Sequence, residues 1–139
     1  MNSAAVDDRL AKRAMTSLQL ASSEADVLQE TLLGEALEHA PVGALVLDEQ
    51  GRYLAANRMA CRLTGYAREE LLRLTPTDLA AHPANVPAKL AELAEGRPLS
   101  GQTQLRRQDG AVVSVAYRAG ETRSGGLPYF VLVFWEDAS

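Results

Sequence analysis

The chain has 139 residues, of which 18 are acidic and 14 basic, giving a formal net charge of −4 at pH 7. This length suits one ordinary domain with its own hydrophobic core, and the acidic balance disfavours a non-specific nucleic-acid binder. The single cysteine, Cys61, cannot form an internal disulfide, and no stretch approaches the roughly 20 apolar residues of a membrane span. Because Asp7, Asp8 and Arg9 interrupt the place of a signal peptide, we expect a cytoplasmic protein without membrane or direct nucleic-acid contact.

Residues 1–38 are predicted to form an amphipathic helical segment, and residues 39–139 a separate domain. The first 40 residues contain no proline and are rich in Ala, Leu, Glu and Gln. Small and apolar residues recur at steps of three and four, as in a coiled-coil seam: Ala11, Ala14, Leu18, Ala21, Ala25, Leu28 and Leu32. The next two positions with this spacing are Glu35 and His39, so the seam ends after Leu32. We therefore expect a homodimer through Leu18, Leu28 and Leu32, although an isolated, solvent-exposed helix is the alternative.

The stretch 41–71 is predicted to form a β-hairpin followed by a helix. The apolar run 42–47 meets the turn sequence Asp-Glu-Gln-Gly, and Tyr-Leu-Ala-Ala at 53–56 returns beside it. Asn57 has the side chain to cap a new helix, and Gly65 is suited to end it.

Two short helices and three strands are predicted to follow. Pro76 suits the first turn of a helix capped by Thr75, and a second helix ends before Gly96 with Val86, Leu90 and Leu93 on one face. Strands 99–107 and 111–120 flank Gln-Asp-Gly, a strong hairpin signal. Ser-Gly-Gly at 124–126 then turns the chain into strand 128–136. The fold class is therefore α+β.

This order of elements resembles the PAS family of sensor domains. The resemblance rests on A-P-V-G-A-L-V-L-D-E-Q-G-R-Y-L-A-A-N, then L-T-G-Y-x-x-E-E-L, then R-R-Q-D-G-A-V-V-S-V and the ending V-L-V-F-W-E-D-A-S. It implies a five-stranded antiparallel sheet with short helices on one face, where they wall a ligand pocket.

By this resemblance the last two strands are assigned an inner and an outer face. Residues expected to point into the pocket are Val113, Val115, Tyr117, Ala119, Val131, Val133 and Trp135. Phe130, Leu132 and Phe134 are then expected to point outward, where three large apolar side chains would be unusual if wet. We expect the end of the N-terminal helix, with Leu33 and Leu37, to cover them, so all five residues join the predicted association surface.

Catalytic motifs are missing from the sequence, so we do not expect an enzyme. Candidate pocket-lining residues are Asn57, His82, Leu90, Val115, Tyr117, Val133 and Trp135. The segment D-L-A-A-H-P resembles the proximal histidine stretch of haem-binding relatives, which makes His82 the one axial-ligand candidate. Flavin photochemistry would need a cysteine near Pro76, where the sequence has none; a non-covalent flavin stays open. We expect no bound cofactor.

The resemblance implies a signal-input role. A ligand, redox change or partner would alter the pocket, and dimer contacts would pass the change to an effector such as a kinase, a cyclase or a transcription regulator. Two alternatives stay open: a pure dimerisation module whose pocket is filled by its own side chains, and a haem-based gas sensor that uses His82.

Overall fold

A computed structural model describes residues 23–137 of the chain. By its internal contacts the chain divides between Ala36 and Leu37. The described part of the N-terminal unit is helical, in a helix that covers residues 23–38. No helix within residues 23–137 is long and apolar enough to cross a membrane.

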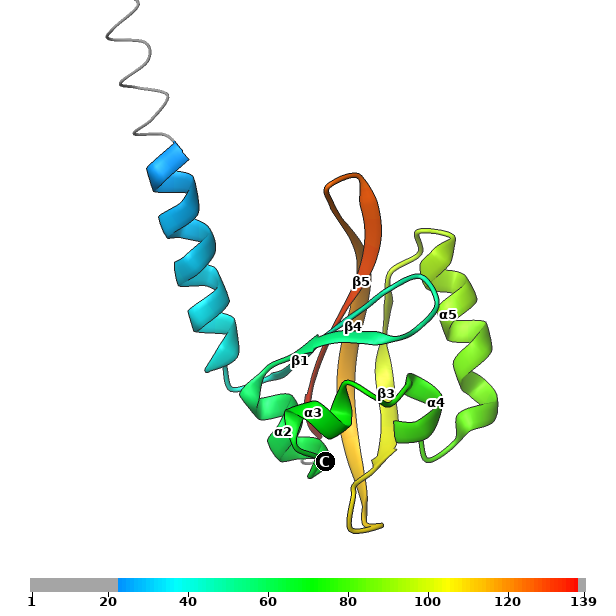
Figure 1. Ribbon diagram of the computed structural model, residues 1–139. Helices are drawn as coiled ribbons and strands as arrows, with labels where there is room; N and C mark the ends of the chain where they lie inside the picture. The colour runs from blue at the N-terminus through cyan, green and yellow to red at the C-terminus, as the bar shows by residue number, and fades with distance from the viewer. Residues whose placement is uncertain (1–22, 138–139) are drawn as a thin grey trace, which may run out of the picture. The chain divides into compact units, whose positions relative to one another are not determined.

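The second unit is built on one antiparallel sheet of five strands, in the spatial order β2-β1-β5-β4-β3 (Figure 1). The strands are β1 (Gly43–Leu47), β2 (Tyr53–Ala56), β3 (Leu99–Arg106), β4 (Val112–Ser124) and β5 (Leu127–Glu136). The last strand therefore pairs with the first in the middle of the sheet, and the helices connect β2 with β3. This is the predicted α+β architecture.

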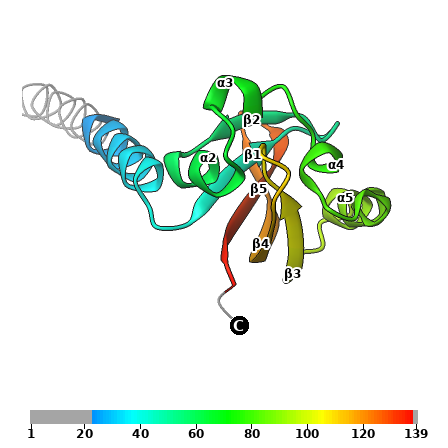
Figure 2. The same ribbon diagram turned by 90° about the horizontal axis from the view of Figure 1, so that it is seen from below.

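Four α-helices and one 3-10 turn lie between β2 and β3. They are α2 (Arg58–Thr64), α3 (Arg68–Leu71), α4 (Pro76–Leu79), the 3-10 turn η1 (Pro83–Asn85) and α5 (Val86–Ala94). In both views α5 runs beside β3, and α4 lies next to α5 (Figures 1 and 2). The backbone of Ala81 donates to Gln104 O at 3.0 Å, which holds the end of α4 against β3.

Local sequence explains where these elements begin and end. Asp48 closes the β1–β2 turn, because its carboxylate accepts from the backbone N–H groups of Gln50 and Arg52 at 2.9 Å each. Asn57 caps α2 by accepting from Ala60 N, and Gly65 ends this helix with a φ of 77°. The predicted hairpin and the predicted cap are both present.

The core lies between the sheet and the helices. Its fully buried side chains include Leu45, Leu71, Leu79, Val115 and Phe134. They come from β1, α3, α4, β4 and β5, so the closing strand and the helices share one core.

Candidate functional site

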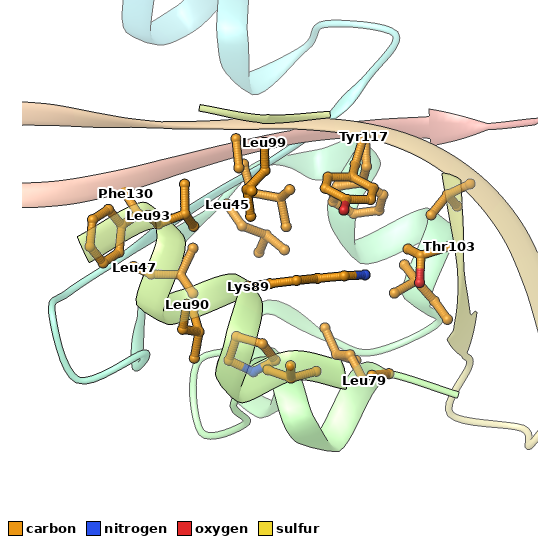
Figure 3. A pocket seen from close by; sticks show the side chains of 18 of the residues that line it. Leu45, Leu47, Leu79, Lys89, Leu90, Leu93, Leu99, Thr103, Tyr117 and Phe130 are labelled. Atoms are coloured by element: carbon orange, nitrogen blue, oxygen red, sulfur yellow. The ribbon is translucent and has the colours of Figure 1, made fainter. Parts of the chain in front are cut away.

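A cavity of about 110 Å³ lies between the inner face of the sheet and helices α4 and α5 (Figure 3). Its wall is almost entirely hydrocarbon. Leucines and phenylalanines from both sides supply most of it: Leu45, Leu47, Leu79, Leu90, Leu93, Leu99, Leu105, Phe130, Leu132 and Phe134. Native cores are close-packed, so a hollow of this size inside one is a candidate ligand site.

The structure corrects the predicted faces of β5. Phe130, Leu132 and Phe134 line the cavity, and Phe130 and Phe134 are 2% and 1% exposed. Directly paired residues of antiparallel strands share a face, and the inward-pointing Tyr117 pairs with Phe134. The alternate residues Val131, Val133 and Trp135 therefore lie on the outer face, where Trp135 is 36% exposed.

The hairpin turn sets this register. Ser124 pairs with Leu127, which leaves only Gly125 and Gly126 in the loop, with φ values of 59° and 80°. Two positive φ angles are what a tight two-residue hairpin requires. The prediction placed Tyr117 on the same face of the sheet as Val131, Val133 and Trp135. A shift of one residue in the pairing moves every side chain of a strand to the opposite face.

The correction also changes the predicted association surface. Phe130, Leu132 and Phe134 need no external cover, because they lie on the inner face, where both phenylalanines are buried and Leu132 is partly buried. Leu33 and Leu37 of the N-terminal helix are 62% and 42% exposed. Leu18 lies outside the described residues.

The structure separates the residues that were predicted to line the pocket. Leu90, Val115 and Tyr117 do line the cavity. Val133 instead borders an open hollow of about 470 Å³ on the outer face, together with Val131 and Arg118. Asn57, His82 and Trp135 lie outside the cavity wall, so for these residues and Val133 the predicted location is wrong.

His82 occupies an exposed position at the start of η1. Its Nε2 lies 3.1 Å from Oε1 of Gln104 on β3, and this contact joins η1 to the sheet edge. An axial ligand must reach into the pocket that holds the haem, and this imidazole does not. The described residues also contain no cluster of three or more His, Cys, Asp or Glu that would hold a metal ion.

Four polar side chains interrupt the hydrocarbon wall: Tyr53, Lys89, Thr103 and Tyr117. Lys89 extends from α5 across the cavity toward Tyr117 and Thr103 (Figure 3), and its Nζ lies 5.2 Å from the centre of the Tyr117 ring. Within residues 23–137, no hydrogen bond is made by the hydroxyls of Tyr53, Thr103 and Tyr117.

Tyr53 is 5% exposed, so its hydroxyl is held in an apolar environment. Burial raises the pKa of Tyr53 far above its usual value, and the nearby negative charge of Asp78 raises it further. The phenol therefore stays neutral at any ordinary pH and can offer a hydrogen bond into the cavity.

Sequence reasoning missed Lys89, although the sequence carried a signal for it. Lys89 stands three residues after Val86 and four before Leu93, and so falls on the apolar face of α5. A basic residue inside an apolar stripe indicates a charge that points toward the core side.

A second group of contacts lies at the start of the second unit, around Leu37 and Glu38. Asn57, 5% exposed, donates from Nδ2 to Leu37 O at 2.6 Å and to Val42 O at 2.9 Å. Its Oδ1 accepts from Ala44 N at 2.8 Å and Ala60 N at 3.0 Å. One side chain thus ties the end of the N-terminal helix, β1 and α2 together.

Arg68 of α3 adds a second link to the same helix end. Its Nε donates to Ala56 O at 2.9 Å, and its guanidinium forms an ion pair with Glu38. Asn57 and Arg68 therefore contact two consecutive residues, Leu37 and Glu38, where the N-terminal helix ends.

Comparison with known proteins identifies the family. The PAS fold family matches residues 31–138. The chain belongs to the PAS family.

Solved structures show the same fold. A domain of the sensory box sensor histidine kinase/response regulator from Geobacter sulfurreducens is 25% identical with a TM-score of 0.71, over 78% of this chain and 94% of that chain. The PAS domain of an HTR-like protein from Haloarcula marismortui is 21% identical with a TM-score of 0.71, over 84% and 99%. An RNA-binding light-oxygen-voltage receptor is 24% identical with a TM-score of 0.71, over 80% of this chain and 34% of that chain.

Proposed function

We propose that this chain is a sensory module that binds a small ligand in the cavity between the sheet and helices α4 and α5. Binding would alter the contacts at the end of the N-terminal helix and so reach an effector. The observation that carries the proposal is the cavity itself, about 110 Å³ of mostly hydrocarbon-lined space inside a PAS fold. Similar structures include a domain of a sensor histidine kinase, which supports a role linked to an effector such as a kinase, a cyclase or a transcription regulator.

The route from cavity to helix runs through β1 and α2. Leu45 and Leu47 of β1 line the cavity, and Ala44 of the same strand donates to Asn57. Asn57 in turn holds Leu37, the last residue but one of the helix. A ligand that displaces β1 by a fraction of an ångström would therefore strain bonds at the helix end, where Arg68 holds Glu38 as well.

Amide NMR of the full chain tests the proposal with benzyl alcohol as a neutral probe. We expect chemical-shift changes at cavity residues such as Val115 and Leu90, and also at Leu37 and Glu38. Arg68→Gln should weaken the changes at Leu37 and Glu38 while the cavity residues still respond. Arg62→Gln is the matched control, because Arg62 is an exposed arginine on α2 that forms no ion pair within residues 23–137.

Two results would contradict this function. A chain whose amide spectrum is unchanged at millimolar benzyl alcohol has no accessible cavity, and the pure dimerisation module would then replace the sensor. That alternative has one supporting observation, since the Lys89 side chain itself lies across the cavity (Figure 3). Changes confined to the cavity would leave a ligand site without the proposed route.

We also propose that the N-terminal helix pairs with a second copy of the chain. It carries large apolar side chains that are 42–62% exposed: Val27, Leu28, Leu32, Leu33 and Leu37. Helices that expose this much apolar surface usually bury it against a partner.

Paired substitutions on the full chain test which side of this helix associates. Leu28→Glu with Leu32→Glu should convert a dimer to a monomer in sedimentation velocity, because the two leucines continue the seam. Leu33→Glu with Leu37→Glu tests the other exposed leucines of the set. Ser23→Glu with Gly34→Glu adds the same charge at exposed positions without a large apolar side chain and should leave the dimer intact. If the unmodified chain sediments as a monomer, the pairing is wrong.

A further inference from the structure

We infer that the ligand of this cavity is a small monocarboxylate whose negative group is held by Lys89 and whose apolar body packs against the leucines. The inference rests on the proposed function, because it names the class of ligand for the same cavity. It is carried by the charge and hydrogen-bonding character of the wall.

Lys89 is the one charged side chain in the cavity wall, and it has no acidic partner within residues 23–137. Some described arginines do pair with carboxylates, and these are Arg52 with Asp48, Arg68 with Glu38, Arg97 with Glu95, Arg107 with Asp109 and Arg123 with Glu121. Unlike the arginines that form no ion pair in the described chain, such as Arg62, Lys89 lines a cavity. Its ammonium lies over the ring of Tyr117, with Nζ 5.2 Å from the ring centre. A positive charge beside an apolar cavity favours an anion as the missing partner.

The other polar groups favour the same chemistry. Lys89 offers three donors and no acceptor, and each hydroxyl of Tyr53, Thr103 and Tyr117 has a donor to give. None of these hydroxyls has a partner in the described chain, and all three residues line the cavity wall. No carboxylate from the described part of the chain lines the cavity to compete for these donors. A carboxylate accepts several hydrogen bonds at once, so it fits this set better than a cation or an amine does.

The volume of the cavity and the apolar character of its wall limit the part of the ligand that carries no charge. An engineered cavity of about 150 Å³ in another protein holds benzene, so about 110 Å³ suits a single ring or a short chain. A second charge would have no partner among the leucines, which disfavours dicarboxylates. The class is therefore a short aliphatic or aromatic monocarboxylate.

Benzoate and benzyl alcohol form a matched pair of probes, because they share the ring and differ in charge. We expect the full chain to bind benzoate at least about tenfold more tightly than benzyl alcohol in an NMR or calorimetric titration. Lys89→Met keeps the apolar stem and removes the charge, so it should abolish this preference while benzyl alcohol still binds. Lys89→Arg should retain most of it. Arg97→Met changes net charge equally outside the cavity and should leave benzoate binding unchanged.

The outcomes separate the two proposals. Equal affinity for both probes, or benzoate binding that survives Lys89→Met, would overturn the carboxylate inference and leave the ligand-binding function standing. No binding of either probe would overturn both. Lys89→Gln serves as the second neutral variant if Lys89→Met fails to give a folded amide spectrum. Tyr117→Phe should give a smaller loss than Lys89→Met, since it removes one hydrogen bond and keeps the ring.

Discussion

The two faces of β5 differ although their residues are similar in size and hydrophobicity. Phe130 and Phe134 on the inner face are almost fully buried, whereas Trp135 on the outer face is 36% exposed. Composition cannot distinguish these faces, since both consist of large apolar side chains. What distinguishes them is the partner: the inner face meets the helices and the cavity, and the outer face meets none of the cavity-lining helices.

Replacing one aromatic residue on each face should give the largest contrast. Phe134→Ala removes a ring that is 1% exposed and leaves a hole beside the cavity, so we expect a loss of about 3–5 kcal/mol in the free energy of unfolding. Trp135→Ala should lose only about 1–2 kcal/mol, because a side chain that is already partly hydrated leaves no enclosed hole. Urea denaturation followed by far-ultraviolet circular dichroism measures both. A larger loss for Trp135→Ala would reverse the assignment of the faces.

Replacing two glycines by alanine should change the free energy of unfolding in opposite directions. A Cβ added at Gly43 would lie 2.6 Å from Cε1 and Cζ of Phe134, so this ring, which is 1% exposed, would have to shift. Gly43→Ala should therefore cost about 1–3 kcal/mol in urea denaturation. Gly120 pairs with Val131 of the outer face, and a Cβ added at Gly120 would meet nothing within 4 Å. Gly120→Ala should be neutral or stabilising by up to about 1 kcal/mol, since it reduces the freedom of the unfolded chain.

The double variant Gly43→Ala with Phe134→Leu sharpens this test. If the cost of Gly43→Ala comes from the ring, shortening the side chain at 134 should remove part of that cost, and the two effects will not add. Strict additivity would mean that the cost has another origin.

The sequence was sufficient for the fold because its signals are local. Asn57 is followed by a helical pattern that Gly65 ends, and the Gln-Asp-Gly turn connects two strands that pair in the expected order. Each of these features depends on residues a few positions apart. The faces of β5 depend instead on how the strand registers against β4, which the Gly125-Gly126 loop determines. Reading that loop as a two-residue hairpin would have given the correct phase.

The candidate site was harder to predict than the fold. His82 stands out in the sequence, but its side chain bonds to Gln104 on the edge strand and does not reach the cavity. Lys89 is inconspicuous in the sequence, yet it enters the cavity because α5 turns that face toward the sheet. Tyr53 and Thr103 come from strands at opposite edges of the sheet, and only the closed fold brings them to one wall.

Burial of Tyr53 should make stability depend on pH in the alkaline range, where we expect the smallest effect. The raised pKa of Tyr53 means that the unfolded chain releases this proton near pH 10 while the folded chain keeps it. The stability contributed by the neutral phenol is complete below about pH 10 and is lost as the pH rises above it. Between pH 10 and 11 this loss should be about 1 kcal/mol, and Tyr53→Phe should lack it. Tyr129→Phe removes a hydroxyl from the outer face of β5 and is the control for the substitution itself. Urea denaturation at pH 9, 10 and 11 measures the three curves, and parallel curves for Tyr53→Phe and the unmodified chain would mean that Tyr53 is not held in the apolar inner face.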